Sequence, residues 1–131
     1  MINIFNFSTV KKEHGKKKAN ISKIKEDCLA DKDYLNEIML LINNNIDEFY
    51  ENTEIYLKAK DRFSISRAAH KVKNGLEMVQ AFTLLDYLDM IQKECQYVDT
   101  YQNIKQLITD FKVEYQLVVI ELQSQIDEME A

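Results

Sequence analysis

Residues 104–122 read IKQLITDFKVEYQLVVIEL, and this stretch decides the fold. Ile104, Phe111 and Val118 lie seven residues apart in it, with further apolar residues between them. This spacing places them along one side of an α-helix, as in a heptad seam. We expect this helix to cover about residues 100–129, which is long enough for one side of a helical bundle. Four interleaved residues complete the seam: Ile108, Tyr115, Leu122 and Met129.

Composition favours an all-helical fold. The chain has 131 residues, with two glycines and no proline. A β protein of this size needs many tight turns, and tight turns draw on those two residue types. The length suits a single domain, and 46% hydrophobic with 30% charged residues is typical of a globular protein.

Further amphipathic helices are predicted upstream of the seam by apolar residues at three-and-four spacing. Because their connections are short, we expect an antiparallel up-and-down four-helix bundle with a short additional N-terminal helix. A homodimeric coiled coil through the last helix is the alternative, and it would leave the other apolar stripes without partners. The predicted helices cover about residues 20–29, 34–60, 61–81 and 84–97.

Local signals refine the expected helix boundaries. Asp31 or Asp33 can cap the long second helix, and Thr83 can cap the helix over 84–97. The run Asn43-Asn44-Asn45 is poor helix material, so we expect it to bend or interrupt the second helix.

Charge is divided unevenly along the chain. Residues 1–25 contain seven lysines and one acidic residue, Glu13, so they sum to +6, and the remainder sums to −11. This acidic body argues against nucleic-acid binding. We assign residues 1–19 to a basic, flexible N-terminal tail and 20–131 to the helical domain. The tail is either a solvated extension without function or an electrostatic contact for a membrane or an acidic partner.

The cysteines and apolar runs indicate a cytoplasmic protein. Cys28 and Cys95 are too few for a disulfide framework, and their separation fits no metal-binding pattern. No apolar run approaches the roughly 18 residues of a membrane span. At the N-terminus the apolar residues precede the lysines, which is the reverse of a secretory signal.

The helix expected over 61–81 carries the stretch Ala69-His70-Lys71-Val72-Lys73-Asn74-Gly75. At about 100° per residue, His70 and Lys73 lie on the polar side, opposite the apolar stripe. A lysine three residues after a histidine lies on the same face about one turn away. A phosphoryl group bound to the imidazole nitrogen would therefore have a cation to balance its charge.

Residues 20–128 resemble a histidine phosphotransfer (HPt) domain. Ala68-Ala69-His70-Lys71-Val72-Lys73 is similar to the alanine–histidine–x–aliphatic–lysine signature of that family, and the order of helices agrees. The resemblance implies that His70 accepts the phosphoryl group and that Lys73 holds the phosphoryl oxygens. It also implies that Gln92, opposite residue 70 in an antiparallel hairpin, orients the imidazole.

The sequence departs from the family directly after the lysine. The family usually has glycine there, whereas this chain has Asn74, followed by Gly75. A glycine inside a helix costs roughly 0.8–1 kcal/mol relative to alanine, so we expect Gly75 to keep the approach to His70 open. We expect Lys71 and Met78 to join these two residues in the partner-binding surface.

The resemblance implies a phosphoryl carrier rather than an enzyme. It would accept a phosphoryl group on His70 and pass it to or from an aspartate of a response-regulator receiver domain in a multistep phosphorelay. Its partners would be receiver domains and a hybrid sensor histidine kinase, and the receiver would supply Mg²⁺. We expect a monomer with no metal site, cofactor or nucleotide-binding loop of its own. The alternative is a non-catalytic helical adaptor or scaffold in which His70 does no chemistry.

Overall fold

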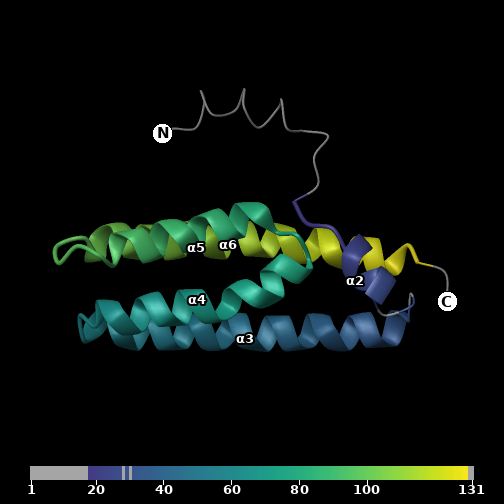
Figure 1. Ribbon diagram of the computed structural model, residues 1–131, viewed down its shortest axis with the longest axis horizontal. Helices are drawn as coiled ribbons and strands as arrows, with labels where there is room; N and C mark the ends of the chain where they lie inside the picture. The colour runs from purple at the N-terminus through teal and green to yellow at the C-terminus, as the bar shows by residue number, and fades with distance from the viewer. Residues whose placement is uncertain (1–17, 28, 30, 130–131) are drawn as a thin grey trace, which may run out of the picture.

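The computed structural model describes residues 18–27, 29 and 31–129, and these residues confirm the all-helical prediction. Each long helix packs against the next along the chain, and the last also contacts the first of them. Figure 1 shows the α3–α4 pair beside the α5–α6 pair, with the short α2 near the C-terminal end of α6. The helices of the described residues are α2 (Ser22–Asp27), α3 (Lys32–Lys58), α4 (Arg62–Met78), α5 (Phe82–Glu94) and α6 (Tyr101–Asp127).

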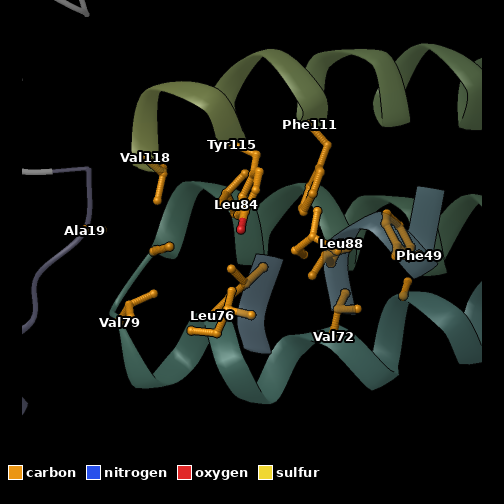
Figure 2. Close-up of a cluster of buried hydrophobic side chains, with 14 of the residues drawn as sticks. Ala19, Phe49, Val72, Leu76, Val79, Leu84, Leu88, Phe111, Tyr115 and Val118 are labelled. Atoms are coloured by element: carbon orange, nitrogen blue, oxygen red, sulfur yellow. The ribbon is translucent and has the colours of Figure 1, made fainter. Parts of the chain in front are cut away.

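The core lies between the long helices and confirms the predicted seam of α6. Ile104, Phe111 and Val118 are all 0% exposed. Figure 2 shows Phe111 and Val118 pointing from α6 into a cluster that includes Leu88 of α5 and Phe49 of α3. The rings of Phe49 and Phe111 lie 5.5 Å apart between centroids in a tilted arrangement. Full burial of such side chains stabilises a fold by roughly 1.5–3 kcal/mol each.

The expected interruption of the second helix was wrong, because α3 runs unbroken through Asn43-Asn44-Asn45. Ile42 and Ile46 flank this run and are both buried, so tertiary packing outweighs the weak helix propensity of asparagine. Asn43 also gains a partner, since its side-chain oxygen accepts a hydrogen bond from the Tyr115 hydroxyl of α6. At the start of α3, Asp31 is confirmed as the cap, because it accepts a hydrogen bond from the Tyr34 N–H.

Both α3 and α4 end in the same kind of turn. Lys60 and Gln80 adopt left-handed backbone conformations with φ of 54° and 55°. Backbone hydrogen bonds of 2.9–3.1 Å close each turn in a Schellman motif. Thus α4 ends at Met78 rather than near residue 81. The next helix begins at Phe82 after Ala81, which makes no side-chain cap bond, so Thr83 is not the cap that we expected.

The packed part of the chain begins before the predicted boundary at residue 20. Ala19 is 1% exposed, and its N–H donates to Glu121 of α6 at 3.1 Å. Its carbonyl accepts from the Gln125 side chain at 2.9 Å. The rest of the expected tail, residues 1–17, lies outside the described residues. None of the helices within the described part of the chain is long and apolar enough to span a bilayer.

Candidate functional site

His70 lies in the middle of α4 with its side chain exposed. The opposite side of the same helix is buried, and Ala69 and Leu76 are both 0% exposed. The predicted placement of His70 on the polar face is therefore confirmed. An exposed imidazole on a packed helix is open to a partner molecule while its backbone is held in place.

The beginning of α4 is fixed by a capping network at Asp61. The Asp61 carboxylate accepts hydrogen bonds from the Ser64 N–H at 3.1 Å and from the Ser64 hydroxyl at 2.7 Å. These two bonds lower the pKa of the Asp61 carboxyl. Arg67 extends the network by donating to the Ser64 hydroxyl oxygen at 3.0 Å. Because this cap anchors the first turn, it helps to set which face of α4 presents His70.

Lys73 lies one turn beyond His70 and is held against α5. Its ammonium lies 2.6 Å from a carboxylate oxygen of Asp89, and its side chain is only 21% exposed. The aspartate is 64% exposed, so solvent screens this pair, and such pairs contribute about 0.2–1 kcal/mol. The contact therefore does more to position the ammonium than to stabilise the fold.

Asp89 is a candidate site residue that we did not predict from the sequence. The hairpin register that places residue 92 opposite residue 70 also places residue 89 opposite residue 73, because each step along α4 is matched by a reverse step along α5. A carboxylate at position 89 was thus the signal that could have identified the partner of Lys73.

Gln92 reaches α4 one turn before His70. Its side-chain N–H donates to the Ser66 carbonyl at 3.2 Å. Ser66 precedes His70 by four residues, so the observed contact of Gln92 with α4 lies one turn away from the predicted position opposite residue 70. Its expected role in orienting the imidazole stays a prediction.

The structure gives different surroundings to the four residues predicted to bind a partner, which are Lys71, Asn74, Gly75 and Met78. The Lys71 ammonium pairs with Glu48 of α3 at 3.2 Å, and Met78 packs against the core. A Cβ built on Gly75 would lie 3.2 Å from Cγ1 of Ile42. The close packing of α4 on α3 therefore favours a glycine at this position. Asn74 is exposed. A role in partner binding stays a prediction for these residues.

An exposed aromatic residue that we did not predict lies on the histidine face of α4. Phe63 precedes His70 by seven residues, or about two turns, and is 65% exposed. It borders an open groove that also includes Ser66, Gln92 and Cys95. Burial raises the pKa of the Cys95 thiol to about 11, so this cysteine is a poor nucleophile at neutral pH.

The described residues contain no group of three or more histidine, cysteine or acidic side chains placed to hold a metal ion. Comparison of the chain with protein-family models, with curated proteins and with solved structures gave no significant match.

Proposed function

We propose that this chain is a histidine phosphotransfer protein of a multistep phosphorelay, built as an antiparallel up-and-down four-helix bundle with a short additional N-terminal helix. The observation that carries the proposal is the exposed imidazole of His70 with the anchored ammonium of Lys73 one turn away on the same helix. An inert surface histidine requires neither an anchored cation nor an adjacent exposed aromatic residue such as Phe63.

The chemistry is an in-line displacement at phosphorus. An unprotonated nitrogen of His70 attacks the phosphorus atom of an aspartyl phosphate in a receiver domain. A P–N bond forms, the P–O bond to the aspartate breaks, and the aspartate leaves as a carboxylate. The proton on the other ring nitrogen stays in place. The reverse reaction delivers the phosphoryl group to a second receiver and restores His70.

Lys73 stabilises the phosphoryl group in this proposal. An ammonium has three N–H donors, so the contact with Asp89 leaves donors for the phosphoryl oxygens. The side-chain N–H of Gln92 is bound to Ser66, so the carbonyl oxygen of Gln92 is the atom left to accept the ring N–H of His70. The protein's own contribution is thus positioning and charge balance, and it acts as a phosphoryl carrier with no intrinsic cofactor.

The proposed partners supply the groups that this chain does not provide. A receiver domain supplies Mg²⁺ and the aspartate, and a hybrid sensor histidine kinase supplies the phosphoryl group upstream. Exposed Phe63 provides apolar contact for the receiver beside the polar histidine face. The proposed protein is a cytoplasmic monomer that binds no nucleic acid. A helical adaptor is the second candidate function, and it would bind a receiver without taking up phosphate.

The proposal is tested by incubating the purified chain with a receiver domain that carries a radiolabelled aspartyl phosphate, in the presence of Mg²⁺. We expect the label to move to this chain as acid-labile, base-stable phosphate. His70→Gln should take up none while its far-ultraviolet circular dichroism stays unchanged, and the control His14→Gln should behave like the natural chain. Binding of the receiver without any transfer would favour the adaptor instead.

A further inference from the structure

The line of α6 residues directly opposite the buried seam carries no charged residue between positions 102 and 124, and the exposed Lys105 and Lys112 lie on one flank of this line. A helix face exposed to water normally carries many charged residues. Val113, Leu117 and Ile120 are 61%, 44% and 66% exposed and form an apolar stripe at its centre. The exposed residues of this outward face are Gln102, Gln106, Thr109, Val113, Leu117, Ile120 and Ser124.

The described chain begins at the edge of this apolar stripe. The Lys18 ammonium lies 3.3 Å from both carboxylate oxygens of Glu114, which directly follows Val113 in α6. The next residue, Ala19, donates its N–H to Glu121, which directly follows Ile120. Figure 1 shows this first described segment passing α6 before it enters α2. Lys18 and Ala19 therefore both contact acidic side chains that flank the stripe.

The preceding seventeen residues match the stripe in composition and charge. Residues 1–10 carry no charged side chain and include Ile2, Ile4, Phe5 and Phe7. Residues 11–17 carry four lysines and Glu13, so residues 1–17 sum to +3 and the remaining chain sums to −8.

Chain length allows this segment to reach the stripe. The eight residues from position 10 to 18 span at most about 28 Å when extended. The stripe from Val113 to Ile120 is only about 10 Å long, because an α-helix rises 1.5 Å per residue.

We propose that residues 1–10 of this chain dock on the Val113–Leu117–Ile120 stripe of α6, with the lysines that follow them facing the acidic residues beside it. A tethered segment acts at an effective concentration in the millimolar range, so an apolar contact with a dissociation constant below about 1 mM is mostly occupied. A second copy of the chain fits less well, because two chains that each sum to −5 repel one another, whereas residues 1–17 sum to +3 and are attracted to the rest of the chain. The docked segment leaves the site open, since His70 lies on α4, which packs on α3 and α5.

The test measures how well the full-length protein shields the methyl groups of the stripe. Methyl NMR with a soluble paramagnetic gadolinium chelate reports the exposure of Leu117 and Ile120. We expect both to be shielded in the natural chain, and the double variant Phe5→Ser, Phe7→Ser to raise their relaxation enhancement at least threefold. The matched control Asn3→Ser, Asn6→Ser should leave it unchanged. Equal exposure of these methyl groups in all three proteins would overturn the proposal.

Sedimentation at the protein concentration of the NMR experiment distinguishes shielding by the N-terminal segment from shielding by a second copy of the chain. We expect a monomer in which the stripe is shielded by its own N-terminal segment. A dimer whose stripe stays shielded in the Phe5→Ser, Phe7→Ser variant would assign the stripe to a second copy and overturn the proposal. Phosphate uptake at His70 should be equal in all three proteins, so a failure of this inference is distinguishable from a failure of the proposed function.

Discussion

The α3–α6 interface and the α4–α5 edge are both formed by neighbouring helices, yet they are held together differently. At the first, Phe49 and Phe111 are 2% and 0% exposed, and their rings pack in a tilted arrangement within the core. At the second, Lys73 pairs with Asp89 in partial contact with water, next to the exposed His70. Burial therefore provides the stability at one place, and partly exposed contacts position the candidate site residues at another. Changes at the α4–α5 edge should alter chemistry and leave the fold intact.

The largest effect on stability should come from the α3–α6 interface. Phe111→Ala removes a fully buried ring and leaves a cavity beside Phe49, which typically costs 3–5 kcal/mol of unfolding free energy. Urea unfolding monitored by circular dichroism measures this loss. A change below about 1 kcal/mol would mean that this interface does not dominate stability, and the comparison would fail.

A change at Lys73 should strongly affect phosphotransfer and have little effect on the unfolding free energy. Charge-assisted contacts are worth roughly 1.5–3 kcal/mol, so Lys73→Ala should slow phosphotransfer or shorten phosphohistidine lifetime about 10- to 100-fold. Its unfolding free energy should change by less than about 1 kcal/mol, because the pair with Asp89 is exposed on one side. Quench-flow transfer and urea unfolding measure the two quantities.

Two matched variants sharpen the Lys73 prediction. Lys71→Ala removes a lysine that pairs with Glu48 of α3 instead, so it should leave the transfer rate at saturating receiver concentration nearly unchanged, even if receiver binding weakens. Asp89→Asn keeps the Lys73 cation but weakens its anchor, so its effect on transfer should be smaller than that of Lys73→Ala. Equal rates for Lys71→Ala and Lys73→Ala would show that position 73 has no special part in the chemistry.

Tyr115→Phe at the α3–α6 interface should lower the unfolding free energy by less than Phe111→Ala does. This change deletes the hydroxyl that donates to Asn43 and leaves a part-buried amide oxygen without that donor, at a cost of about 1–3 kcal/mol. Burial raises the pKa of Tyr115, so this hydroxyl keeps its proton as a donor throughout the neutral range. Thermal unfolding of the variant and the natural chain measures the difference, and an unchanged midpoint would show that water replaces the lost partner.

The smallest effect on stability is expected for Gly75→Ala. The change gains about 1 kcal/mol of helix propensity, but the added Cβ would lie 3.2 Å from Ile42 and crowd it. We therefore expect a net change in unfolding free energy of less than about 1 kcal/mol. Calorimetric titration with a receiver domain shows which surface Gly75 serves. A tenfold loss of receiver affinity at unchanged stability would assign Gly75 to the partner surface.

The spacing of apolar residues predicted most of the fold, because the residues on the buried side of a helix recur about once per helical turn. The spacing of Ile104, Phe111 and Val118 was sufficient to identify the buried side of α6. Helix ends were harder to predict, because Lys60 and Gln80 occupy left-handed positions where glycine is the usual signal. The unbroken course of α3 through Asn43-Asn44-Asn45 depends on tertiary packing, which local propensity does not contain.

The candidate site was predictable where it depended on one helix. A single helix period placed His70 on the exposed face of α4 and Lys73 one turn away. Contacts between different helices were harder to predict from the sequence. The hairpin register was applied to Gln92 but not to Asp89, and the packing of Gly75 against Ile42 depends on how α3 lies on α4.

We propose that this protein takes up phosphate at the exposed imidazole of His70, beside the anchored ammonium of Lys73. The most direct measurement is tandem mass spectrometry of the intact natural chain, fragmented by electron transfer immediately after exposure to a phosphorylated receiver domain. We expect one added phosphoryl group, located on His70. A phosphoryl group on His14 or on a carboxylate, or none at all, would contradict it.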